Sequence, residues 1–142
     1  MKSFLTNIWT ARALVILGFL LGWGSLSATA GHIGSERHLL VAGIQTHSYH
    51  HFFRELGGDL GAMVAILLIL FAAQSVRTPV SWWVVLILMI GFYGPFWVGT
   101  PFMQELGAPS RGAEINHQMM AIPAFLGCFL AKRHFRGDEA KV

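Results

Sequence analysis

Three histidines, an arginine and a glutamate fall within the twelve residues QTHSYHHFFREL, Gln45–Leu56, of a chain that is otherwise mostly apolar. If this segment is helical, His47, His51 and Glu55 lie one turn apart on one face, because residues i and i+4 are neighbours on a helix. Two imidazoles at this spacing can bind one metal ion. The segment lacks the glutamate of the His-Glu-x-x-His motif, so it does not predict a zinc protease.

A second pattern with ligand spacing is Glu114-Ile-Asn-His117. Glu-x-x-His is the arrangement with which one helix of a bundle supplies two ligands to a metal. Imidazole and carboxylate groups suit zinc, iron or manganese. The two segments together therefore predict a transition-metal site formed by His47, His51, Glu55, Glu114 and His117. A b-type haem between His51 and His117 is the alternative cofactor.

The same residues are also typical of a membrane interface, where amphipathic side chains hold helix ends near the lipid headgroups. In that interpretation His47 and His51 are solvated or hydrogen-bonded. Glu114 then only stabilises the start of a helix through the helix dipole. A third interpretation is acid–base catalysis by one histidine, whose ordinary pKa suits that role.

The elements that must position these residues are predicted from four apolar segments that contain no charged residue or histidine: 13–30, 60–76, 80–99 and 118–131. In a chain of 142 residues that is 54% hydrophobic and only 12% charged, membrane-spanning helices are the natural explanation. We expect one all-α domain, an integral membrane four-helix bundle with spans at about 12–30, 59–76, 80–99 and 115–132. An additional interfacial helical stretch is expected on the outer side, from about His38 to Leu56.

The lysine and arginine distribution predicts the orientation of these spans. Three basic residues belong to the side that carries the histidine cluster, Arg37, Arg54 and Arg111, and the other seven belong to the side of the termini. The positive-inside rule then places both termini in the cytoplasm, in a plasma or inner membrane, with the histidine-rich loop outside. Residues 1–31 also have the features of a signal peptide, and cleavage there would leave the following segment outside as well.

Two further patterns concern partners. Gly18 and Gly22 form a G-x-x-x-G pattern, which allows close helix packing either within the chain or with a membrane-protein partner or a second copy. The basic residues lie at the ends of apolar segments and form no stripe or known nucleic-acid motif. We therefore expect contact with the lipid bilayer and not with nucleic acid.

Function is predicted only as a class. The four apolar segments lack ionisable residues, which disfavours ion or proton transport by this chain alone. The leading hypothesis is a non-catalytic accessory or assembly component of a membrane complex. The alternatives are a metal- or haem-binding membrane redox protein and a membrane enzyme that acts on a lipid or a quinone.

Overall fold

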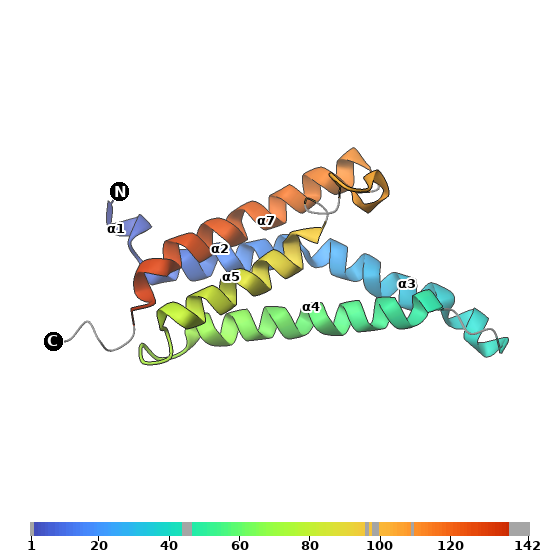
Figure 1. Ribbon diagram of the computed structural model, residues 1–142, viewed down its shortest axis with the longest axis horizontal. Coiled ribbons are helices and arrows are strands. Elements are labelled where there is room, and N and C mark those ends of the chain that lie inside the picture. Colours follow the sequence, from blue (N-terminus) through green and yellow to red (C-terminus); the bar gives the residue numbers. More distant parts are fainter. Residues whose placement is uncertain (1, 44–46, 96, 98–99, 109, 137–142) are drawn as a thin grey trace.

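The computed structural model describes residues 2–43, 47–95, 97, 100–108 and 110–136. Its longest feature is a pair of helices that continue one another, α2 (Ile8–Leu21) and α3 (Trp23–Val41), with Gly22 between them. A short helix, α1 (Lys2–Leu5), precedes α2. The Asn7 side chain caps α2 by accepting a hydrogen bond from the backbone N–H of Trp9 at 2.9 Å. The first and last described residues of the chain, Lys2 and Arg136, belong to the same end of the molecule (Figure 1).

Three more long helices complete the bundle: α4 (His47–Phe71), α5 (Pro79–Tyr93) and α7 (Arg111–Ala131). Helix α5 begins with a capping box between Thr78 and Ser81 and has Pro79 in its first turn. Ser110 caps the start of helix α7, and its hydroxyl accepts a hydrogen bond from the backbone N–H of Ala113. Two short 3₁₀ helices, η1 (Gln104–Leu106) and η2 (Lys132–His134), lie before and after α7.

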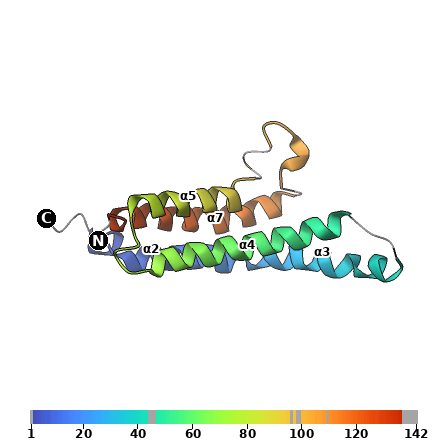
Figure 2. The same ribbon diagram turned by 60° about the horizontal axis from the view of Figure 1, so that its bottom comes forward.

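The helices form two layers, with α5 and α7 over α4 and the α2–α3 rod (Figure 2). Helix α2 packs most extensively on α7, and glycines on both helices allow this approach. A Cβ atom on Gly18 would lie 2.6 Å from the carbonyl oxygen of Met120, and one on Gly127 would lie 2.6 Å from that of Ala11. Gly22 is also buried here, 3.2 Å from the Met120 sulfur by the same measure. The G-x-x-x-G pattern therefore packs within the chain.

The apolar core fills the half of the bundle nearer the termini. Within it, the Trp82 indole N–H donates a hydrogen bond to the Cys128 carbonyl at 3.0 Å, and Phe19 meets Phe92 edge to face. The residues buried most completely come from all four long helices: Ala11, Val15, Ile66, Leu70, Val85, Met89, Tyr93, Ala121, Ala124, Cys128 and Ala131.

A cation is buried at the edge of this core. Arg12 is only 8% exposed, and its Nε–H donates a hydrogen bond to the Leu70 carbonyl at 3.0 Å. Its guanidinium carbon lies 4.5 Å from the ring centroid of Trp9 and 4.6 Å from that of Phe71. Because α4 ends at Phe71, Arg12 satisfies a carbonyl that has no partner within that helix. From its place at the end of an apolar segment, Arg12 is expected only to contribute to membrane topology, and its burial is a new finding.

The predicted all-helical fold is confirmed, and the described residues contain no strand. The prediction of an additional interfacial helical stretch from about His38 to Leu56 is wrong. His38 belongs to the end of α3, and His47–Leu56 forms the first turns of α4, with residues 44–46 outside the described part. Among the described helices, Ile8–Ser35 meets the length and hydropathy required to cross a membrane, whereas Pro79–Tyr93 is apolar but has only 15 residues.

Candidate functional site

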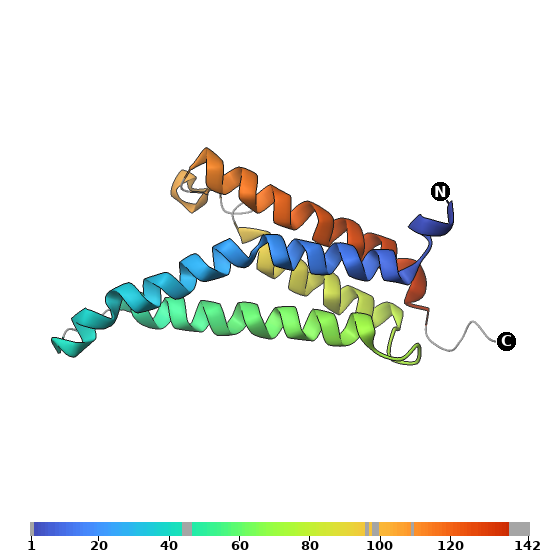
Figure 3. The same cartoon turned by 180° about the vertical axis from the view of Figure 1, so that it is seen from behind.

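The helices diverge at the end of the bundle away from α1 (Figures 1 and 3). A polar cavity lies among the residues of this part, beyond the apolar core. It consists of two adjoining hollows of about 350 and 360 Å³. Five residues line both hollows and come from α3, α4 and α7: Ser25, Thr29, Glu55, His117 and Met120. Asp59 lines the first hollow in addition, and His32 and Asn116 line the second.

The lining of this polar cavity is acidic. Glu55 and Asp59 are spaced i and i+4 on α4, so both carboxylates face the same direction. Neither forms a hydrogen bond or an ion pair with another described residue, and no lysine or arginine lines either hollow. The cavity therefore presents negative charge and hydrogen-bond acceptors, together with the hydroxyl groups of Ser25 and Thr29.

His117 is the buried polar residue of this site, at 3% exposure. Its Nε2 atom lies 2.7 Å from the carbonyl oxygen of Tyr93, the last residue of α5. A carbonyl oxygen only accepts hydrogen bonds, so Nε2 carries a proton and donates it to Tyr93. The Trp97 ring meets the imidazole edge to face at 4.9 Å. Together these contacts fix the orientation of His117.

The residues predicted to bind metal fall into separate groups. The Nε2 atoms of His47 and His51 lie 2.7 Å apart on the exposed surface of α4, so one ring donates a hydrogen bond to the other. Glu55 and His117 line the polar cavity. Glu114 instead accepts hydrogen bonds from the Trp97 indole at 3.3 Å and from the Gln118 amide at 2.9 Å.

Within the described part of the chain, no three His, Cys, Asp or Glu side chains are arranged to hold a metal ion. The structure therefore does not assemble the five predicted ligands, and metal binding stays a prediction. The haem alternative meets a further obstacle, because the Nε2 atoms of His51 and His117 both participate in hydrogen bonds. Ligation through these atoms would require both bonds to break.

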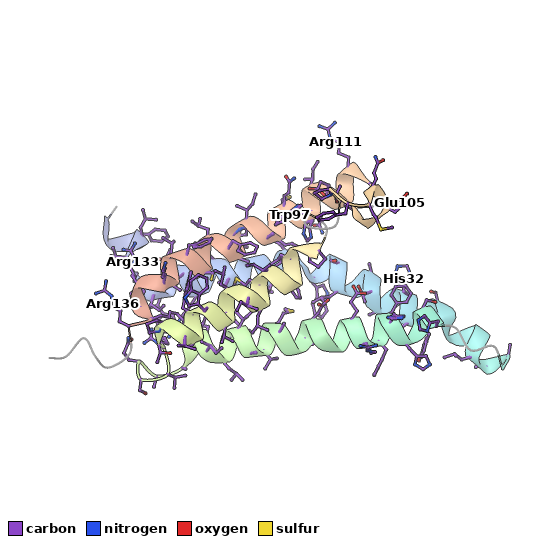
Figure 4. All side chains as sticks on the ribbon, viewed as in Figure 1. His32, Trp97, Glu105, Arg111, Arg133 and Arg136 are labelled. Atoms are coloured by element: carbon purple, nitrogen blue, oxygen red, sulfur yellow. The ribbon has the colours of Figure 1, made fainter. Side chains whose placement is uncertain are left out.

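Several residues near the cavity were not predicted from the sequence. Figure 4 shows His32 on α3 and Trp97 on the other side, near the start of α7. His32 stacks on Phe52 of α4 with ring centroids 4.7 Å apart, which joins the two helices beside the cavity. Ser25 and Thr29 are spaced i and i+4 within an apolar segment, a pattern that indicates one polar stripe. Trp97 had no such signal, since its partners are distant in sequence.

Comparison of the chain with protein-family models, with curated proteins and with solved structures found no match. Function must therefore be argued from the geometry and chemistry of the site.

Proposed function

We propose that the protein is a small multi-pass membrane protein that binds the amine-bearing head of a small ligand or lipid in its polar cavity. The observation that carries this proposal is the pair of neighbouring carboxylates, Glu55 and Asp59, in a cavity of about 350 Å³ whose lining has no lysine or arginine. The role is binding without catalysis, as in the accessory function that the sequence predicts.

The surface of the bundle supports a location in the membrane. Large apolar side chains on every long helix are between 63% and 72% exposed: Leu20, Leu68, Val80, Ile87 and Ile122. Soluble monomers rarely expose large contiguous apolar surfaces, so exposed apolar side chains on α2, α4, α5 and α7 favour a lipid environment. We propose that four spans, including the shorter α5, cross the bilayer, with both termini in the cytoplasm and the polar cavity toward the outer side.

The cavity chemistry favours a primary ammonium group. Carboxylates accept hydrogen bonds, and charge-assisted bonds from an ammonium to a carboxylate are stronger than neutral ones. The hydroxyls of Ser25 and Thr29 and the Asn116 amide supply further acceptors. Such a group is present in an ethanolamine phospholipid and in a free amine. His117 uses its Nε2–H to hydrogen-bond the Tyr93 carbonyl. This bond supports a role for His117 in positioning the cavity wall.

Cysteine accessibility tests the membrane arrangement. The single native cysteine, Cys128, is fully buried, so Ser48→Cys and Ser75→Cys each add one exposed thiol at opposite ends of α4. We expect a membrane-impermeant maleimide to label Ser48→Cys in intact cells and Ser75→Cys only after permeabilisation. Labelling of both from one side of the membrane would contradict the arrangement.

Ligand binding is tested by native mass spectrometry of the detergent-solubilised protein with phosphatidylethanolamine or phosphatidylcholine. We expect a preference for phosphatidylethanolamine that falls roughly tenfold or more in the double variant Glu55→Gln/Asp59→Asn, because charge-assisted hydrogen bonds are lost. Glu105→Gln, an exposed acid outside the cavity, is the matched control and should retain binding.

Competition by free ethanolamine distinguishes the two sources of the amine. Displacement of the lipid would show that the amine alone is recognised, and no displacement would show that the lipid is required. Equal binding of both phospholipids in the wild type, or an equal loss in Glu105→Gln, would contradict the proposed ligand class.

A further inference from the structure

A separate hollow, of about 400 Å³, lies at the end of the bundle opposite the polar cavity. Its charge is positive, whereas that of the polar cavity is negative. It is lined by Phe129, Lys132, Arg133 and Arg136. Arg133 and Arg136 project from the end of the molecule near the termini (Figure 4). We refer to these four residues as the basic hollow. Three of its four lining residues are cations, and none is an acid.

Aromatic rings lie beside the basic hollow. The Lys132 ammonium lies 4.6 Å from the ring centroid of Trp82, and the rings of Trp82 and Phe129 lie 6.2 Å apart. Phe129 is 54% exposed and faces outward from α7. Aromatic rings beside basic side chains are typical of the level at which lipid headgroups meet acyl chains.

Positive charge extends beyond the four lining residues. Burial lowers the pKa of His134, and the charges of Arg77, Arg133 and Arg12 lower it further, whereas its hydrogen bond to the Thr6 carbonyl raises it. None of the acids whose side chains the structure describes lines the basic hollow. These acids are Glu55, Asp59, Glu105 and Glu114. Asp138 and Glu139 lie outside the described residues. The described part of this end is therefore positively charged, with Arg12 and Arg77 near the four lining residues.

We propose that the basic hollow binds the phosphate headgroup of an anionic phospholipid in the adjacent membrane leaflet, with Phe129 beside its acyl chain. Guanidinium groups form paired hydrogen bonds to phosphate oxygens, and Arg133 and Arg136 supply two of them. Clusters of basic residues beside membrane helices bind anionic lipids for this reason. The inference rests on the proposed membrane location and does not depend on the ligand of the polar cavity.

The test is native mass spectrometry of the full chain in mild detergent, titrated with phosphatidylglycerol or with phosphatidylcholine. We expect one phosphatidylglycerol to be retained in preference to phosphatidylcholine. Arg133→Gln/Arg136→Gln should weaken this binding by roughly twenty-five-fold, because each basic residue near an anionic surface contributes about fivefold. Arg133→Lys/Arg136→Lys, which keeps the charge but not the planar donors, should weaken it less.

The control is Arg54→Gln/Arg111→Gln, which removes the same charge from exposed positions at the other end. An equal loss in this control, equal binding of both lipids, or full displacement of phosphatidylglycerol by inorganic phosphate would overturn the inference. Circular dichroism should show unchanged helical content in each variant. A loss of lipid binding then reflects the substituted side chains and not unfolding of the protein. Failure of the membrane proposal would instead appear in the accessibility of Ser48→Cys and Ser75→Cys, whichever lipid is added.

Discussion

The imidazole Nε2 of His117 lies 2.7 Å from the carbonyl oxygen of Tyr93, and this hydrogen bond joins α7 to the last residue of α5. The carbonyl belongs to the last turn of a helix, where no backbone N–H of the same helix is available. His117 therefore completes the hydrogen bonding of α5 and holds one wall of the polar cavity in place.

Replacement of His117 by phenylalanine should destabilise the fold by about 1–3 kcal/mol, because the Tyr93 carbonyl loses its partner in a buried place. His117→Gln can still donate a hydrogen bond and should recover part of the loss. Thermal unfolding followed by circular dichroism in mild detergent measures both variants. A phenylalanine variant as stable as the wild type would show that this bond is not needed.

The two glycines Gly18 and Gly24 provide a matched test of the α2–α7 contact. A Cβ atom on Gly18 would meet the Met120 carbonyl oxygen and the Ala124 side chain at 2.6 and 2.7 Å, whereas one on Gly24 would meet nothing within 4 Å. Gly18→Ala should therefore destabilise the protein by about 1–3 kcal/mol. Gly24→Ala should be neutral or stabilising, because alanine is the better helix former. Equal effects in thermal unfolding would argue against close packing at Gly18.

Arg12 is expected to stabilise the end of α4. Arg12→Met keeps much of the aliphatic volume but removes the hydrogen bond to the Leu70 carbonyl and the contacts with the Trp9 and Phe71 rings. We expect a loss of about 2 kcal/mol in the free energy of unfolding, typical for a hydrogen bond from a charged group. Arg136→Gln, which alters an exposed arginine, is the control. Hydrogen exchange should show faster opening of the last turn of α4 in Arg12→Met alone.

His134 should make stability dependent on pH. Burial first, and then nearby arginines, lower its folded-state pKa below the unfolded value of about 6.5. The folded state then binds fewer protons than the unfolded state between these two pKa values. The contribution of His134 is therefore present above pH about 6.5 and is lost as the pH falls through its folded-state pKa.

The measurement is a series of unfolding curves from neutral to mildly acidic pH. His134→Gln retains a donor for the Thr6 carbonyl but cannot titrate, so its stability should fall less over this range. If the variant and the wild type lose stability in parallel, His134 is not the group responsible.

The helices could be predicted because each contains an apolar segment long enough to be recognised without knowledge of its partners. Their ends were less predictable. The third span was expected to continue to residue 99, but α5 ends at Tyr93, before the Gly94-Pro95 pair. The second span was expected to begin near residue 59, whereas α4 begins at His47. Its first turns are polar and pack beside α3, so no apolar segment marks them in the sequence.

The candidate site was predictable only in part. The spacing of Glu55 and Asp59 places both on one face of α4, as the sequence indicates, and the cavity that they line also includes His117. The sequence could not show that Glu114 binds Trp97 and Gln118 instead of facing Glu55, because helix rotation depends on packing. The burial of Arg12 was equally invisible, since its partner Leu70 is distant along the chain.

The glycine-lined contact between α2 and α7 has a consequence for the order of assembly. These helices come from distant parts of the chain, with α3, α4 and α5 between them. Their tightest interface can therefore close only after the ribosome has made the whole intervening segment. Until then the glycine-containing face of α2 has no α7 to pack against. During that interval this face is accessible to a chaperone or to the membrane-insertion machinery.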